Sequence, residues 1–262
     1  MRALRLSSRL LPLLLCCQLV MATAKGRGKK LAKGEHSSLD LYGHVTRDVQ
    51  TRALSSQSAY EARQGLKVLL GSKNGTLSPM MVRRDASVER AVFADFSRRL
   101  TNKDALVGVG PGKSILCVGA RLGGEVRAFT RLGALAVGVD FMPGFRNAWS
   151  LWGDATHIQF ANGVYDYVYC NIIDHIDPRH KFLAEVARVL KRGGMLVAYV
   201  DQNKPDAFSV HDNRGETLVK MRAEMASAGL IIAREEKHGG GKTERPLPQN
   251  WGGTVVFVAR KA

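Results

Sequence analysis

The strongest structural signal in the chain is Ile115-Leu-Cys-Val-Gly119-Ala-Arg-Leu-Gly123-Gly124-Glu125, with Asp140 21 residues after the first glycine. A short apolar run, typical of a buried strand, enters a glycine turn, and a helical pattern follows. Gly119 permits a tight turn, while Gly123 and Gly124 allow a ligand or a neighbouring element to approach the backbone. N–H groups at the start of the helix favour an anionic group. A carboxylate at Asp140 suits the ribose hydroxyls of an adenosine-containing cofactor, although such glycine turns also occur in α/β folds without one.

Strand-like and helix-like patterns alternate on both sides of this stretch. Predicted strands cover residues 115–119, 134–140, 165–172, 195–201, 230–234 and 254–260, and predicted helices cover 85–100, 125–132, 178–190 and 216–228. Asp85 is the expected N-cap of the first of these helices. Alternating strands and helices predict an α/β, Rossmann-like doubly wound sheet that is covered on both faces. Ligands of such sheets bind at the carboxyl ends of the strands.

Composition and length limit the class of protein. The chain has 262 residues, of which 45% are hydrophobic and 24% charged, as in ordinary globular proteins. These values exclude a chain that is mainly disordered, collagen-like or a coiled coil. Four cysteines without a Cys-x-x-Cys pair exclude a cysteine zinc site and a disulfide-dense module. The seven histidines show no paired spacing on one helix, so we expect no metal.

The positive charge is concentrated in the first part of the chain. The formal net charge is +16, and residues 1–113 hold +12 of it. Such a basic region attracts nucleic acid, an anionic membrane or an acidic substrate. We favour the alternative of a processed leader followed by a solvated tail, because the lysines and arginines of residues 25–33 lie among glycines without an interleaved aromatic residue.

The first 24 residues resemble a targeting peptide. Arg2, Arg5 and Arg9 precede an apolar run from Leu10 to Val20, and Ala22-Thr23-Ala24 fits a cleavage site. This layout predicts a signal peptide and the secretory pathway or an endomembrane, and cleavage would leave no stable membrane insertion. A plastid or mitochondrial transit peptide and an uncleaved anchor are alternatives. We divide the remainder into a basic linker with a helical extension, 25–84, and a main domain, 85–262.

Three further motifs follow the glycine turn in a characteristic order. Gly153-Asp154-Ala155 is expected after the helix that follows the second strand. The third strand ends in Asn171-Ile172-Ile173-Asp174-His175, and the turn Leu190-Lys191-Arg192-Gly193-Gly194 precedes the next strand. Over about residues 85–262 this order resembles the class I S-adenosylmethionine-dependent methyltransferases and is similar to their broad type 11 group.

The resemblance implies a sheet, a cofactor and a set of contacts. In the family, the final short strand, here Thr254–Arg260, inserts antiparallel between the two strands before it. The cofactor would be S-adenosyl-L-methionine, with the glycine turn at its methionine end, Asp140 at the ribose, Asp154 and Ala155 at the adenine, and Asn171 beneath the sulfonium. The implied cofactor-binding positions are Gly119, Ala120, Arg121, Gly123, Asp140, Phe141, Asp154, Ala155 and Asn171.

The glycine motif departs from the family pattern at two positions. The family usually has an acid two residues before the first glycine, where this chain has Cys117, and the usual middle glycine is Arg121. Loss of the acid weakens the grip on the amino group of the cofactor. Arg121 is a candidate to compensate by pairing with the cofactor carboxylate.

The catalytic candidates follow the third predicted strand. His175 could act as a general base beside Asp174, because the pKa of an unperturbed histidine is near neutrality. A structural alternative is that His175 caps the turn at Asp177-Pro178. Trp149 and Trp152 either flank the adenine or an aromatic acceptor, or belong to the core.

Methyl transfer to a small-molecule, lipid or glycan-like acceptor is the function that these features favour. A variant is an RNA or protein methyltransferase recruited through the basic N-terminal region. Two alternatives do not involve methyl transfer. Cys117 and Arg121 favour a catalytically degenerate binding protein with a methyltransferase fold. An NAD(P)-binding oxidoreductase would also have a glycine turn, but its Gly-x-Gly-x-x-Gly fingerprint is replaced here by Gly-x-x-x-Gly-Gly.

Overall fold

The computed structural model describes residues 79–143, 147–201, 214–238 and 254–262. The predicted leader, residues 1–24, and most of the predicted extension, residues 25–84, lie outside the described residues. The assignments for these two segments therefore stay predictions. Within the described ranges, no helix has both the length and the apolar character needed to cross a membrane.

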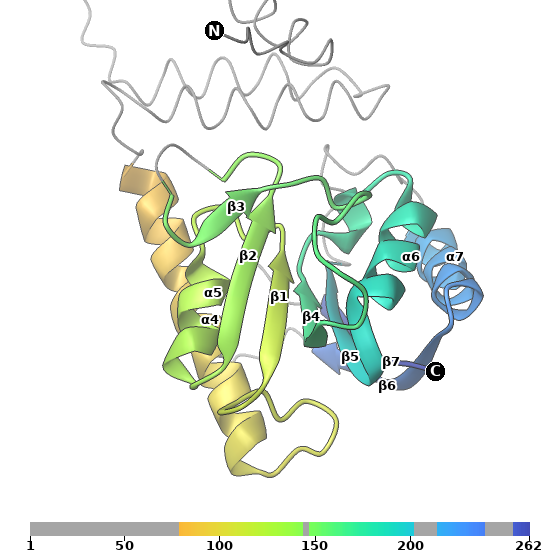
Figure 1. Cartoon of the computed structure of the whole chain (residues 1–262), viewed down its shortest axis with the longest axis horizontal. Helices are drawn as coiled ribbons and strands as arrows, with labels where there is room; N and C mark the ends of the chain where they lie inside the picture. Colours follow the sequence, from red (N-terminus) through yellow and green to blue (C-terminus); the bar gives the residue numbers. More distant parts are fainter. Residues whose placement is uncertain (1–78, 144–146, 202–213, 239–253) are drawn as a thin grey trace, which may run out of the picture. The chain divides into compact units, whose positions relative to one another are not determined.

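A seven-stranded sheet with the order β3-β2-β1-β4-β5-β7-β6 forms the centre of the described domain (Figure 1). Its strands are β1 Ser114–Val118, β2 Leu135–Asp140, β3 Ser150–Trp152, β4 Tyr165–Cys170, β5 Leu190–Asp201, β6 Leu230–His238 and β7 Thr254–Lys261. Neighbours from β3 to β5 are parallel, whereas β7 is antiparallel to both β5 and β6. The predicted sheet, including the inserted last strand, is confirmed.

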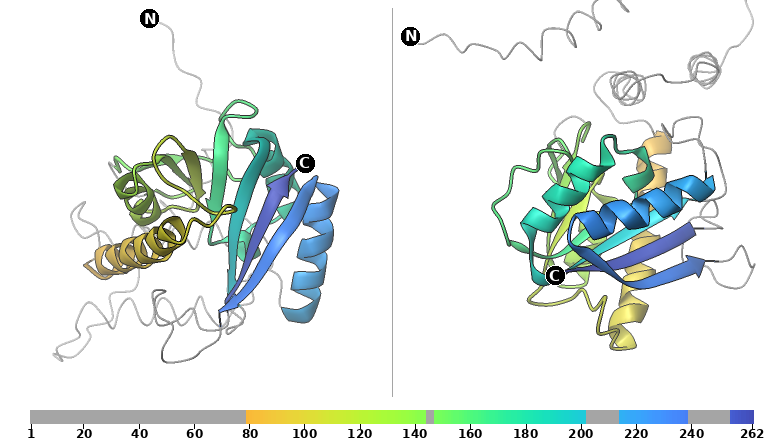
Figure 2. Two further views of the ribbon diagram at one scale, coloured as in Figure 1. Left: turned by 90° about the horizontal axis from the view of Figure 1, so that it is seen from below. Right: turned by 90° about the vertical axis from the view of Figure 1, so that its right-hand side faces the viewer.

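Helices cover both faces of this sheet (Figure 2). One face carries α4 Pro79–Thr101 and α5 Gly124–Arg131, and the other carries α6 Arg179–Val189 and α7 Arg214–Ser227. A short 3-10 turn, Ile173–His175, follows β4. Because β1, β2 and β4 are parallel, their carboxyl ends lie together along one side of the sheet, which we call the carboxyl edge. The opposite edge is the amino edge.

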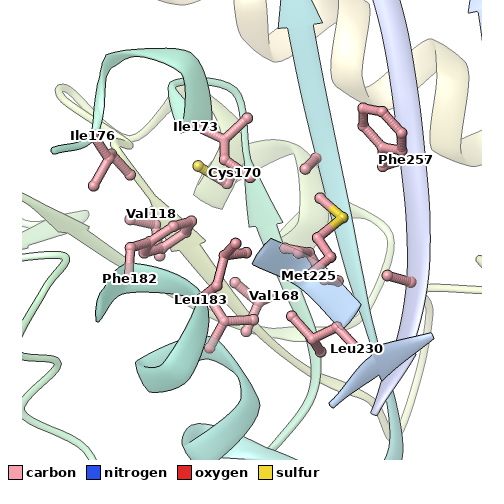
Figure 3. Close-up of a cluster of buried hydrophobic side chains, with 14 of the residues drawn as sticks. Val118, Val168, Cys170, Ile173, Ile176, Phe182, Leu183, Met225, Leu230 and Phe257 are labelled. Carbon is pink, nitrogen blue, oxygen red and sulfur yellow. The ribbon is translucent and has the colours of Figure 1, made fainter. Parts of the chain in front are cut away.

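Alternation along the strands creates two cores. In β1, Leu116 and Val118 belong to the core beneath α6 and α7, while Ile115 and Cys117 belong to the core beneath α4 and α5. Figure 3 shows the first core, in which side chains from β1 and β4 meet those of α6 and α7. Burial on both faces explains why the strands are almost continuously apolar.

The position of Asp85 differs from the prediction. Helix α4 begins at Pro79, so Asp85 lies inside it and is not its N-cap. Its Oδ1 instead accepts a hydrogen bond from the Gly124 N–H at 3.0 Å, and its Oδ2 pairs with Arg127. Asp85 therefore satisfies the first turn of α5 from a neighbouring helix, which a local sequence pattern does not reveal.

Two features of the sheet were also not predicted. Strand β3 is only three residues long, and it is an outermost strand of the sheet, where it pairs with β2. The Lys191–Gly194 turn lies within β5 as an irregularity, because Tyr165 pairs with Leu190 whereas Tyr167 pairs with Met195. The extra residues bulge out of the ladder, and Gly193 adopts the left-handed conformation there, with φ of 74°.

Polar contacts to Asp166 connect the strands at the amino edge. The Asp166 Oδ2 atom accepts hydrogen bonds from the Ser114 N–H at 2.9 Å, from the Ser114 hydroxyl at 2.8 Å and from the Lys191 Nζ at 2.9 Å. Burial alone would raise the pKa of Asp166, but these donors lower it to about 2. The carboxylate therefore joins the starts of β1, β4 and β5.

Candidate functional site

The loop between β1 and α5 lies at the carboxyl edge and has an unusual backbone. Gly119, Arg121 and Gly123 all have positive φ, of 80°, 43° and 87°. The N–H groups of Gly119 and Ala120 both donate to the Val139 carbonyl, at 2.8 and 3.2 Å. The loop therefore turns across the end of β2. Arg121 keeps the left-handed conformation that a glycine adopts without strain, as is typical of functional loops.

The glycines of this loop are required by close approach of the chain itself. A Cβ atom at Gly119 would lie 2.5 Å from the Ile172 side chain, and one at Gly123 would lie 2.2 Å from the Trp149 Cβ. At Gly124 the obstacle is the Asp85 carbonyl, at 2.6 Å. Gly124 therefore serves the packing of α4 against α5, and the residues opposite Gly119 and Gly123 are already in contact with the loop.

Asp140 ends β2 and connects that strand to the loop. Its Oδ2 accepts a hydrogen bond from the Arg121 N–H at 2.9 Å, and its Oδ1 accepts one from the Met142 N–H at 2.7 Å. The carboxylate is partly exposed. Two backbone donors thus fix its orientation, and each oxygen has further lone pairs with which to accept a hydrogen bond from a hydroxyl.

Glu125 is a candidate site residue that the sequence analysis did not identify. It lies in the first turn of α5, is only 4% exposed, and its Oε1 accepts a hydrogen bond from the Asn171 Nδ2 at 2.8 Å. Burial, reinforced by Asp85, raises the pKa of Glu125 to about 7. Asn171 was predicted to contact the cofactor directly, and its side chain is engaged with this carboxyl group. An acid in a first helical turn is usually exposed, so the sequence carries no signal of this burial.

Asp154 and Ala155 lie beyond β3, one strand further out than Asp140. The segment 153–155 follows this short strand and not a helix, so that part of the prediction is wrong. Asp154 is exposed, and its Oδ1 accepts hydrogen bonds from the Thr156 N–H at 2.7 Å and the Thr156 hydroxyl at 2.8 Å. Ala155 is partly buried.

The aromatic residues near β3 are accessible. Trp149 and Trp152 are 43% and 61% exposed, so neither is a core residue. The rings of Phe141 and Trp152 have centroids 6.3 Å apart, which places the residue after Asp140 beside β3. The core interpretation of these tryptophans is therefore wrong, and the interpretation in which they flank a ligand stays a prediction.

His175 and Asp174 form the short turn after β4. The His175 Nε2 lies 3.9 Å from the Asp174 Oδ2, and both side chains are partly buried. They share the carboxyl edge with Asn171, because all three follow β4. The structure thus brings Arg121, Asp140 and Asn171 to the glycine loop, while Asp154 follows β3 and the Asp174-His175 pair follows β4. Among the described residues there is no group of three or more side chains that could hold a metal ion.

The sheet order and the carboxyl-edge loop are those of a class I methyltransferase fold. β7 inserted antiparallel between β5 and β6 is the arrangement that the resemblance implied. Residues 116–198 match the family model described as a methyltransferase domain. The described domain therefore has the fold of the class I S-adenosylmethionine-dependent methyltransferases, and this fold implies binding of S-adenosylmethionine.

Curated relatives match part of the chain. Demethylmenaquinone methyltransferase from Mycobacterium sp. (strain JLS) is 31% identical over 141 residues, which are 47% of this chain and 56% of the relative. The protein of the same name from Mycolicibacterium paratuberculosis is 32% identical over 106 residues, 38% of this chain and 46% of the relative. The chain thus spans about half the length of the curated relatives that it matches.

A solved structure matches a larger part of the chain. It is the Burkholderia thailandensis 1,6-didemethyltoxoflavin-N1-methyltransferase with bound 1,6-didemethyltoxoflavin and S-adenosylhomocysteine. It is 14% identical, and the match covers 88% of this chain and 93% of that chain with a TM-score of 0.50. At this identity the likeness concerns the fold alone.

Proposed function

We propose that the protein transfers the methyl group of S-adenosylmethionine to a small-molecule or lipid-like acceptor. The observation that carries the proposal is Asp140, a carboxylate held by two backbone N–H groups at the end of β2 and beside a left-handed loop. The curated relatives, whose names give demethylmenaquinone as the acceptor, support a small molecule over nucleic acid. The glycan-like acceptor is a less favoured member of the same class.

The residues at the carboxyl edge suit the cofactor in charge and in hydrogen bonding. Asp140 would accept hydrogen bonds from the ribose hydroxyls, and Asp154 with Ala155 would meet the adenine. Gly119, Ala120, Arg121 and Gly123 would line the methionine end. Phe141 and the exposed Trp152 provide apolar surface beside β3. S-adenosylmethionine, when bound, supplies a methyl group that its sulfonium has already activated.

The first turn of α5 argues against the dinucleotide alternative. A dinucleotide places its pyrophosphate on free N–H groups at a helix start. Here Asp85 already accepts the hydrogen bond of the Gly124 N–H, and the buried Glu125 adds a second carboxyl group. The occupied Gly124 N–H and the buried carboxyl group of Glu125 disfavour a pyrophosphate and favour a ligand with positive charge, such as a sulfonium cofactor.

Asp174 and His175 are the candidate catalytic pair. Methyl transfer to an activated carbon needs mainly orientation of the acceptor and exclusion of water. A base is required only when the acceptor loses a proton, and His175 after β4 would then take that proton, with Asp174 3.9 Å from its Nε2.

Calorimetric titration of the full chain with S-adenosylmethionine and S-adenosylhomocysteine tests the proposal. We expect micromolar binding that Asp140→Asn weakens by about 10- to 100-fold, since hydrogen bonds to a charged group contribute about 1.5–3 kcal/mol each. Asp166→Asn is the matched control, because it removes a carboxylate from the opposite edge of the same sheet. It should leave the affinity unchanged.

Two results would redirect the proposal. If the folded protein binds neither compound, the methyltransferase function is wrong. If it binds both but transfers no methyl group to quinone, phenol or lipid acceptors, the degenerate binding protein is favoured, and Cys117 and the strained Arg121 are then the departures to examine.

A further inference from the structure

Glu125 is a buried carboxyl group without a cationic partner among the described residues. Its side chain accepts a hydrogen bond from the neutral amide of Asn171, at 2.8 Å, and it is 4% exposed. Its own backbone N–H also donates to it. The other buried acid among the described residues, Asp95, is paired: it is 3% exposed and accepts a hydrogen bond from the Arg99 Nε at 2.9 Å. A buried carboxylate without a cation is costly, so its retention calls for a reason.

The groups around Glu125 come from four elements. Asp85 on α4 disfavours its negative charge, whereas Arg121 in the loop and Asn171 after β4 favour it. The buried thiols of Cys117 on β1 and Cys170 on β4 are neighbours within electrostatic range of the carboxyl group. The Arg121 guanidinium acts at a distance and forms no ion pair with Glu125 among the described residues. The surroundings therefore hold the carboxyl group close to the balance between its neutral and charged forms.

Cys117 cannot provide the missing negative charge itself. It is 1% exposed, and burial together with the nearby Glu125 raises the pKa of its thiol well above the ordinary value. The same interaction shows that the Glu125 carboxyl group lies within electrostatic range of the Cys117 position. The carboxyl group of Glu125 on α5 thus lies near the position on β1 where this chain has the neutral Cys117.

We propose that Glu125 binds the ammonium group of the methionyl end of the cofactor, in place of an acid at position 117, and that Asn171 holds the carboxylate in position. The inference rests on the proposed function and assigns a further binding residue to that site. An ammonium group would supply the positive charge that the carboxylate lacks, through a charge-assisted hydrogen bond. Binding would release to solvent the proton that the neutral form of Glu125 carries.

Calorimetry of the full chain at pH 7 in two buffers of different ionisation enthalpy tests this assignment. The probes are S-adenosylhomocysteine and 5′-methylthioadenosine, which keeps the adenosine and lacks the amino acid. Because the pKa of Glu125 is about 7, S-adenosylhomocysteine should release roughly half a proton per site. Methylthioadenosine should release none.

Glu125→Gln should abolish the proton release and weaken S-adenosylhomocysteine by about 10- to 100-fold, with methylthioadenosine unchanged within about twofold. Glu89→Gln is the matched control, because Glu89 pairs with Arg127 on the α4–α5 contact. It should behave like the unmodified chain. Asn171→Ala should weaken only S-adenosylhomocysteine, by a smaller factor.

The outcomes separate this assignment from the function itself. If the unmodified chain binds S-adenosylhomocysteine without proton release and Glu125→Gln binds it equally well, the role of Glu125 is wrong while the function stands. If Glu125→Gln weakens both probes alike, Glu125 only supports the loop and the assignment is overturned. If the unmodified chain binds neither probe, the proposed function itself fails.

Discussion

The two edges of one sheet use their carboxyl groups in opposite ways. At the amino edge, Asp166 receives three donors from Ser114 and Lys191, which lower its pKa to about 2. At the carboxyl edge, Glu125 has an amide partner, and burial raises its pKa to about 7. The amino edge is thus complete within the protein. The carboxyl edge keeps a buried carboxyl group that has no cationic partner among the described residues.

This contrast separates a carboxylate that stabilises the fold from one that, under our proposal, binds a ligand. Perturbed pKa values in both directions occur within a single domain, so the shift alone does not mark a site. The presence or absence of a cationic partner distinguishes the two cases. Four substitutions would break or sharpen the comparison.

The largest effect is expected from Gly119→Ala. The new Cβ would lie 2.5 Å from the Ile172 side chain, and the backbone there has a φ of 80°. Steric overlap therefore adds to backbone strain, and we expect the free energy of unfolding to fall by about 4 kcal/mol. Gly193→Ala at the amino edge is the matched variant, because its φ is 74° but no atom lies within 4 Å. It should lose only about 1 kcal/mol. Denaturant unfolding measures both losses, and equal values would contradict the crowded carboxyl edge.

Glu125→Gln should stabilise the protein at alkaline pH. The pKa of Glu125 in the folded protein is about 7 and lies above the ordinary value of 4.5. The stabilising contribution of its protonated form is therefore complete below pH 4.5 and is lost as the pH rises through 7. Without the carboxylate, the variant should gain on the order of 3 kcal/mol at pH 8 and almost nothing at pH 4. Unfolding measured at both values checks this. A pH-independent difference would show that burial of the charge is not responsible.

Asp166→Asn should have the opposite sign. Its folded pKa of about 2 lies below the ordinary value of 3.8, so its contribution is present above that value and is lost as the pH falls toward 2. Because Asp166 and Lys191 are partly exposed, we expect a loss of only about 1 kcal/mol at pH 7. Urea unfolding between pH 2 and 7 gives the profile. A loss that persists at pH 2 would mean that the charge is irrelevant.

The smallest effect is expected from Arg121→Gly. Relief of strain at φ 43° exceeds the added entropy of the unfolded glycine, so the variant should gain about 0.5 kcal/mol. Lys103→Gly, at φ 53° after α4, should gain a similar amount. Only the Arg121 variant should change the affinity for S-adenosylhomocysteine. If neither variant alters binding, the strain at Arg121 has no functional meaning.

The architecture could be predicted because hydrophobic periodicity and glycine turns are local signals. The described strands and helices match their predicted ranges within a few residues, apart from the earlier start of α4 and the longer β5 and β6. Strand β3 was missed because three residues show no period, and its pairing with β2 is a tertiary contact. Asp85 was misread as a cap of its own helix because the pattern does not show which N–H it meets.

The candidate site could be predicted in outline only. Asp140 ends a strand as expected and contacts the predicted loop through the Arg121 N–H. The position of Asn171 after β4 was also readable, but its partner was not. Burial of Glu125 depends on how closely α5 packs against β1 and β4, which no local pattern encodes. The cofactor roles of Asp140, Asn171 and Asp154 and the catalytic roles of Asp174 and His175 stay predictions.

The insertion of β7 has a consequence for the order in which the chain can fold. Strand β7 pairs with β5 on one side and with β6 on the other, although both precede it in the chain. During synthesis, the edges of β5 and β6 that pair with β7 therefore stay unpaired until residues 254–261 have left the ribosome. Such edges invite pairing with other chains. Nascent chains that stop before residue 254 should accordingly depend on chaperones, while those that extend beyond residue 261 close the sheet themselves.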